Sequence, residues 1–147
     1  MDYQDMTQFA NKCRTVFVAT VDGTKPRVRP LALQFADERG FYFQTEPVKA
    51  LYQQLRTNKN IELCFYDSAG EGLGMVMRVN GEAEFVDDLE LKARLLDEKP
   101  FFKLLGIKES NDPLFALFRV KRGEAFFWTM ADNMRESQIS RITFECA

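Results

Sequence analysis

Apolar and polar residues alternate most clearly between residues 75 and 85. Met77, Val79 and Phe85 fall on one face of an extended chain there, and Arg78 and Glu84 fall on the other. Because successive side chains of a strand point to opposite faces, this period of two predicts a long antiparallel strand with one buried side and one solvated side.

Shorter apolar stretches predict the remaining strands. They occupy residues 16–21, 27–35, 41–45, 61–67, 114–121 and 124–129, and residues 139–144 are a candidate for a last strand. Turn residues at Asp22–Gly23, Asp37–Gly40 and Arg122–Gly123 predict hairpins between neighbouring strands. The glycine-rich segment 68–74 has neither the GxxxxGK[ST] nor the GxGxxG pattern, so it predicts a hairpin loop rather than a phosphate loop.

Helical spacing of apolar residues predicts four helices. The first is an amphipathic helix over residues 2–14. A second is expected directly after residue 45, capped by Thr45 or Glu46. Residues 87–98 begin with a capping arrangement and predict a third, and residues 100–106 predict a short fourth.

Strands joined mainly by hairpins, with helices inserted after the third and fifth, predict a mainly β fold. We expect an antiparallel β-barrel with helices packed on its openings. The βαβ alternation of a parallel sheet is missing, so a Rossmann site is not expected. With 147 residues and no linker or repeat, the chain is expected to form one domain over residues 1–147.

The net charge and the hydropathy of the chain restrict the expected cellular location and the expected binding partners. The net charge is −2 and the pI is about 5.3, whereas a general nucleic-acid binder needs a basic surface. No apolar run approaches the ~20 residues of a membrane-spanning helix, and no signal-peptide pattern opens the chain. We therefore expect a cytoplasmic protein that binds neither nucleic acid nor membrane.

The most informative feature of the composition is the complete lack of histidine. It excludes Ser-His-Asp and Cys-His catalysis, His-ligated zinc and His-ligated haem. The three cysteines are widely spaced and show neither redox nor zinc spacing, so we expect reduced thiols and no metal site. An enzyme built on this chain is expected to take its reactivity from a cofactor.

Residues 27–49 gather cations near the start of a predicted helix. Arg27, Arg29 and Leu31 share one face of a strand, which gives that face a charged end and an apolar end. Thr45 and Lys49 lie where the next strand passes into a helix, and a cation at a helix N-terminus is unfavourable unless an anion lies there. These groups predict a phosphate site; the alternative is that each is a solvated or paired surface charge.

These motifs resemble the pyridoxamine 5'-phosphate oxidase-like flavoproteins. The likeness runs from Phe17–Thr20 through Pro26–Leu31, Phe41–Thr45, Lys49 and residues 55–60 to Val79–Glu84, and it is nearest to the small nitroimidazole-resistance branch. The resemblance implies a split β-barrel that binds FMN, and a homodimer with two flavins at its interface.

The resemblance also assigns site residues. Arg29 matches the strand arginine of the family, and the backbone of Pro30, Leu31 and Ala32 matches the segment that runs along the flavin ring. The complete set of expected cofactor-binding residues is Arg27, Arg29, Pro30, Leu31, Ala32, Gln44, Thr45, Lys49 and Trp128. Lys49 corresponds to the lysine that grips phosphate, Arg27 is expected to assist, and Trp128 corresponds to a tryptophan that reaches the flavin from the partner subunit. Ordinary core or dimer packing is the alternative for Trp128.

Departures from the family restrict the expected activity. The segment after Trp128 lacks the histidine with which true pyridoxamine phosphate oxidases hold substrate, and the histidine of some nitroimidazole-resistance proteins is also missing. We therefore expect an FMN-dependent oxidoreductase for another small molecule, with no acid or base assigned. The alternatives are a flavin-binding or flavin-sensing protein without turnover, and a split barrel that binds a deazaflavin or haem.

Overall fold

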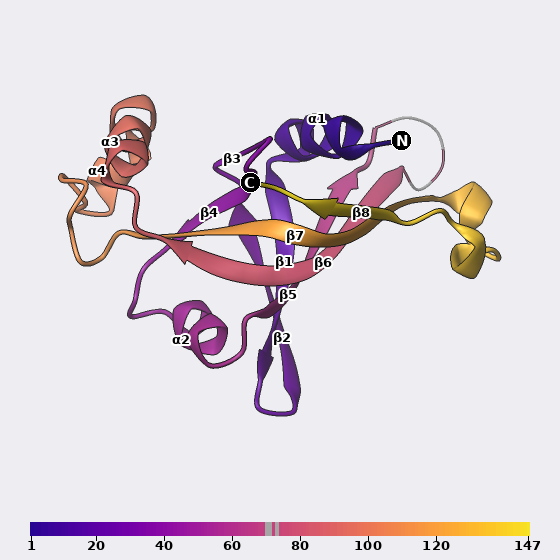
Figure 1. The fold of residues 1–147 in the computed structure, drawn as a ribbon, viewed down its shortest axis with the longest axis horizontal. Helices are drawn as coiled ribbons and strands as arrows, with labels where there is room; N and C mark the ends of the chain where they lie inside the picture. Colours follow the sequence, from indigo (N-terminus) through magenta and orange to yellow (C-terminus); the bar gives the residue numbers. More distant parts are fainter. Residues whose placement is uncertain (70–71, 73) are drawn as a thin grey trace.

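The computed structural model describes residues 1–69, 72 and 74–147, and the chain there is built around one antiparallel sheet (Figure 1). The strands are β1 (Thr15–Asp22), β2 (Lys25–Ala32), β3 (Phe35–Asp37), β4 (Gly40–Thr45), β5 (Asn60–Asp67), β6 (Met75–Val86), β7 (Ala116–Thr129) and β8 (Ile142–Glu145). The helices are α1 (Tyr3–Cys13), α2 (Ala50–Thr57), α3 (Leu89–Glu98) and α4 (Phe101–Leu104), with 3-10 turns η1 (Met130–Asp132) and η2 (Glu136–Gln138).

The strands follow the order β2-β1-β5-β6-β7-β4-β3, and β8 pairs with β7. The path begins at β2 and ends at β3, so the described sheet is open rather than a closed cylinder. The prediction of a mainly antiparallel β fold with inserted helices is confirmed. The expected loop at 68–74 includes residues 70, 71 and 73, which lie outside the described residues.

The predicted hairpin at Arg122–Gly123 is wrong, because β7 continues through both residues as one long strand. β6 pairs with β7 from Met75↔Thr129 to Val86↔Leu117, with a register shift between Gly81 and Ala83. A Cβ added at Gly123 would collide with the backbone oxygen of Asn80. The glycine therefore allows two strands to cross closely at a bulge instead of reversing the chain.

Two hydrophobic cores lie on opposite sides of β4 and β7. The larger core fills the concave side of the sheet and includes Met6 of α1 and Leu51 of α2. The smaller core packs α3 and α4 against the other side of these strands, where Tyr42 and Leu117 point outward. Figure 1 shows α1 lying over one end of the sheet and α3 with α4 at another.

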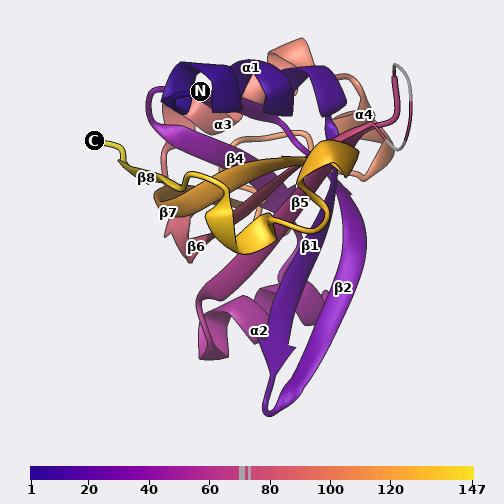
Figure 2. The same ribbon diagram turned by 90° about the vertical axis from the view of Figure 1, so that its right-hand side faces the viewer.

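The β1–β2 hairpin extends away from the body of the molecule, with α2 beside it (Figure 2). Its eight-residue strands pair along their full length, from Thr15↔Ala32 to Asp22↔Lys25. β2 lies at the end of the strand order, so it has a strand partner on one side only. No helix among residues 1–69, 72 and 74–147 has the length and apolar character needed to cross a membrane.

Candidate functional site

Arg29 lies between the hairpin and α2, and neutral groups hold its guanidinium. It pairs in register with Val18, so it points toward the concave side of the sheet. Its Nη1 donates to Thr20 Oγ1 at 2.8 Å and to the Val18 carbonyl at 3.3 Å, and its Nη2 donates to Gln54 Oε1 at 2.5 Å. No carboxylate of the described residues forms a salt bridge with it, so the guanidinium keeps an uncompensated positive charge.

Partial burial lowers the pKa of the Arg29 guanidinium from its usual value. Arginine is so strong a base that the group nevertheless remains charged at neutral pH. A cation that has lost part of its hydration and is bound only by neutral acceptors interacts strongly with an incoming anion. This is the strongest anion-attracting feature of the predicted site.

Thr20 and Gln54 complete the Arg29 cluster, and the sequence analysis missed both. Thr20 is 3% exposed, and its hydroxyl donates to Gln54 Oε1 at 2.6 Å. One signal was present in the sequence: Thr20 is the polar residue in the inward-facing row that begins with Val16 and Val18. No such signal exists in the sequence for Gln54, because this residue lies beside the buried face of α2 and only the folded structure brings it to the hairpin.

Arg27 lies nearer the tip of the hairpin and is paired with an acid. Its Nε donates to Asp22 Oδ2 at 3.2 Å, and about half of each side chain is exposed. Exposed ion pairs of this kind contribute little to stability and exchange readily with solvent ions. Arg27 therefore contributes less directed positive charge to the site than Arg29 does.

The turn between β4 and α2 differs from the prediction at its cap. α2 begins at Ala50 with Lys49 as its N-cap residue, so neither Thr45 nor Glu46 caps it. The Lys49 amide donates to the Glu46 carbonyl at 3.0 Å, which forms a separate turn before the helix. The prediction placed Lys49 inside the first turn of the helix. This was wrong, because Pro47 and Val48 lie in the separate turn that precedes α2.

Buried polar atoms at this corner lack protein partners. Among the described residues, Thr45 Oγ1 and Glu46 Oε2 are buried and make no hydrogen bond. Lys49 Nζ lies 3.2 Å from Glu46 Oε2 without hydrogen-bond geometry, and the lysine side chain is 55% exposed. The lysine is thus loosely held and free to turn toward an anion, and the Thr45 hydroxyl remains available as a donor.

The other expected residues divide into two groups. Pro30, Leu31 and Ala32 lie on β2, whose backbone groups on the side away from β1 have no partner strand in the described part of the chain. Gln44 alternates with Thr45 and faces the α3 side of β4, where its Nε2 donates to the Thr45 carbonyl at 3.1 Å. The fold therefore does not bring the Gln44 side chain to the Arg29 cluster.

Trp128 is also remote from the cluster within one chain. It lies near the end of β7 opposite Val76, while β4 pairs with the other end of β7 at Ala116. Between β7 and the β1–β2 hairpin in the strand order lie β6 and β5. The strand order therefore does not place Trp128 beside the Arg29 cluster of its own chain.

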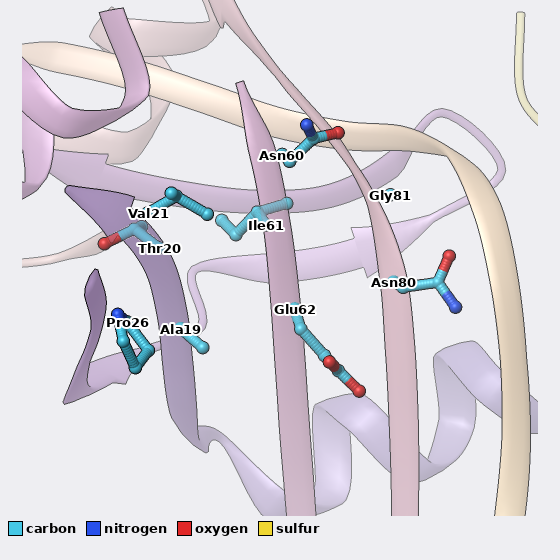
Figure 3. A pocket seen from close by; sticks show the side chains of 9 residues that line it. All are labelled: Ala19, Thr20, Val21, Pro26, Asn60, Ile61, Glu62, Asn80 and Gly81. Atoms are coloured by element: carbon cyan, nitrogen blue, oxygen red, sulfur yellow. The ribbon is translucent and has the colours of Figure 1, made fainter. Parts of the chain in front are cut away.

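A pocket of about 340 Å³ opens on the outer face of β1, β5 and β6 (Figure 3). Its polar side chains are Asn60, Asn80 and Glu62; Thr20 also lines it, although its hydroxyl points to the inner face. Glu62 is ion-paired with Arg78. No lysine or arginine lines it, so this pocket lacks a phosphate grip, although Thr20 places it next to the Arg29 cluster. Elsewhere in the described chain, no cluster of three or more acidic or cysteine side chains is arranged to hold a metal ion.

The described residues fit FMN at two points. The phosphate of FMN is an anion, which suits the uncompensated charge of Arg29, the mobile Lys49 and the unsatisfied Thr45 hydroxyl. A flat ring can lie along the free edge of β2, where backbone groups are open to a ligand. The fit requires Lys49 to leave Glu46 and turn toward the phosphate.

Comparison with known proteins supports the resemblance. Residues 4–129 match the model of the family described as pyridoxamine 5'-phosphate oxidase. The comparison with curated proteins finds no match. Three solved structures below 25% identity share the fold of this chain.

A NimC/NimA family protein from Clostridium acetobutylicum is 23% identical, with a TM-score of 0.77 over 96% of this chain and 92% of that chain. A protein related to general stress protein 26 from the same organism, assigned to the pyridoxinephosphate oxidase family, is 18% identical, with a TM-score of 0.66 over 97% and 92%. HutZ, the haem storage protein of Vibrio cholerae, is 17% identical, with a TM-score of 0.63 over 82% and 89%.

Proposed function

This chain belongs to the pyridoxamine 5'-phosphate oxidase family, and we propose that it binds FMN and uses it as an oxidoreductase acting on a small molecule. At the level of the family, a flavin-binding function of oxidoreductase type is supported. The single observation that carries the proposal is the Arg29 guanidinium, half-buried beside α2 and held only by neutral acceptors. Such a group is suited to bind the anionic part of a nucleotide.

The phosphate is held at the start of α2 in this proposal. Lys49 precedes the helix, and Gln54, which contacts Arg29, is five residues further along. At 1.5 Å per residue the two positions are roughly 7.5 Å apart along the helix axis, so one ligand can contact both. Free amides at the first turn of α2 add positive potential there, because no side chain caps them.

The flavin ring extends from this point along β2. FMN, when bound, supplies the redox chemistry. The backbone of Pro30, Leu31 and Ala32 supports one edge of the ring, and the partly buried Leu31 side chain excludes water from one side. The chain contributes binding and orientation, and no side chain is assigned as an acid or base.

A homodimer completes the site in this proposal. The family is generally dimeric. The outer face of the sheet carries large apolar side chains in contact with solvent, among them Phe17 (46% exposed), Val28 (69%) and Tyr66 (44%). A second copy covering this face removes these groups from water and brings its own Trp128 toward the flavin.

The proposal is tested by adding FMN to purified protein and recording the flavin absorbance, then adding NADH or NADPH without oxygen. An FMN-dependent oxidoreductase binds FMN, is reduced by a donor, and is reoxidised by a quinone or nitro compound. Binding without reduction or reoxidation would identify a flavin-binding protein without turnover. Failure to bind FMN, or copurification of haem or a deazaflavin, would overturn the proposal.

Replacing Lys49 with alanine is expected to weaken FMN binding about three- to tenfold. Lys49 is half-exposed and already near Glu46, so a screened contact worth roughly 0.5–1.4 kcal/mol is lost. Riboflavin has no phosphate, and its dissociation constant is expected to change less. Fluorescence titration with both ligands measures the difference; an equal loss for FMN and riboflavin would contradict a phosphate role for Lys49.

A further inference from the structure

A second cavity, of about 310 Å³, opens between α2 and α3 at the ends of β6 and β7. We call it the α2–α3 pocket. The side chains that define its chemistry are Tyr52, Arg56, Phe85, Asp87, Lys92 and Phe115. Figure 1 shows α2 and α3 on either side of the strand ends that form its floor.

The α2–α3 pocket lies on the opposite flank of α2 from the Arg29 cluster. Tyr52 and Arg56 are four residues apart and share one flank of the helix. Gln54 is two residues from each, which places it about 200° around the axis from Tyr52. It is Gln54 that contacts Arg29, so the two sites are separated by the body of α2.

Arg56 presents a guanidinium without an acidic partner at this pocket. Its central carbon lies 5.9 Å from the Tyr52 ring centroid and 6.0 Å from that of Phe85. Among residues 1–69, 72 and 74–147, no carboxylate forms a salt bridge with it. These cation–π contacts hold the exposed guanidinium near the two rings and leave its N–H groups for a ligand.

Lys92 is the second cation, and it is unusually buried. Its side chain is 9% exposed, and Nζ lies 5.5 Å from the Phe115 ring centroid. The nearest acid is Asp87, with 3.6 Å between Nζ and Oδ1, but the Asp87 side chain is 93% exposed. Within the described chain Nζ donates no hydrogen bond. The stem of Lys92 is thus packed in the protein while its ammonium group, held only by this distant exposed acid, remains free to pair with an anion at the pocket.

We propose that the α2–α3 pocket binds a small aromatic monocarboxylate. The carboxylate pairs with Arg56, which suits its bidentate geometry, and lies near Lys92. The rings of Tyr52, Phe85 and Phe115 provide flat apolar walls for the ring of the ligand. Two cations and the single acid Asp87 leave one net positive charge, which matches a monoanion better than a phosphate dianion.

The volume supports the same ligand class. A cavity of about 310 Å³ is at the lower end for small-molecule sites and accommodates one ring with its carboxylate rather than a flavin. The inference does not depend on the proposed flavin function, because the two sites use different flanks of α2.

Benzoate is the probe for this pocket. It is titrated into the full chain saturated with FMN and, separately, into the chain without FMN. Calorimetry and the NMR shifts of backbone amides in α2 and α3 measure its binding. Binding with a dissociation constant in the millimolar range or below, unaffected by FMN, is expected. Cyclohexanecarboxylate and inorganic phosphate are expected to bind at least several-fold more weakly. Competition between benzoate and FMN, or tighter binding of phosphate than of benzoate, would overturn the inference.

The variants Arg56→Gln and Lys92→Met are each expected to weaken benzoate binding tenfold or more. Arg56 is exposed, so its variant is expected to fold normally, and methionine keeps the volume of Lys92 without its charge. Arg94→Gln is the control, because Arg94 lies on α3 beside Glu98 and outside the pocket. Wild-type affinity for benzoate in both the Arg56 and Lys92 variants would show that the pocket is not the site.

Discussion

Replacing Arg29 with alanine is expected to raise the dissociation constant for FMN about ten- to a hundredfold. A hydrogen bond to a charged group contributes roughly 1.5–3 kcal/mol, and each 1.4 kcal/mol is tenfold in affinity. Among the described residues no acid pairs with Arg29, so its charge is available to the ligand. Fluorescence titration with FMN and riboflavin measures the effect, and the loss is expected to be larger for FMN.

Lys25→Ala is the matched control for Arg29→Ala. Lys25 is an exposed cation at the tip of the same strand and belongs to none of the contacts around Gln54. Its loss removes a positive charge from β2 without altering the proposed phosphate grip. If both variants bound FMN as the wild type does, the site at the hairpin and α2 would be excluded.

Replacing Phe118 with alanine is expected to lower the free energy of unfolding by about 3–5 kcal/mol, the usual cost of deleting a buried aromatic ring. Phe118 is fully buried, stacks on Phe43 at a centroid distance of 5.3 Å and meets Phe85 edge-on at 6.0 Å. These rings lie on three neighbouring strands of the large core. For a domain of this size the melting temperature is expected to fall by roughly 6–20 °C.

Leu104→Ala provides the comparison for Phe118→Ala. Leu104 is 88% exposed on α4, so its truncation is expected to change stability by no more than about 0.5 kcal/mol. Thermal and urea unfolding measure both variants. A Phe118 variant as stable as the Leu104 variant would contradict the central place of the aromatic stack in the core.

Much of the fold was predictable because the alternation of apolar residues and the turn residues are local features of the sequence. The alternation through Met77 and Val79 predicted β6, and the turn at Asp22–Gly23 predicted the β1–β2 hairpin. The same logic failed at Arg122–Gly123, where a turn signal marks a bulge in a continuous strand. A glycine is needed for a tight turn and for a close strand crossing alike, and only the partner strand distinguishes these two uses.

The candidate site was predictable only where it depends on local strand and turn patterns. The strand alternation of β2 placed Arg29 on the inward face, and the sequence placed Lys49 near the start of α2, although one turn too far into the helix. The contacts from Gln54 to Arg29 and Thr20 were not predictable, since they join residues 25 and 34 positions apart. The same holds for the pairing of Lys49 with Glu46, because a sequence does not show which of several nearby acids a cation will choose.

The close crossing of Gly81 and Gly123 limits how the two longest strands can align. Sliding β6 along β7 by one position would put a side chain where no Cβ fits, and it would turn every core-facing residue of the strand toward water. The two glycines therefore fix the register in which β6 and β7 can pair. A misaligned pairing of β6 with β7 is thus opposed by a steric clash at one point as well as by the loss of core contacts.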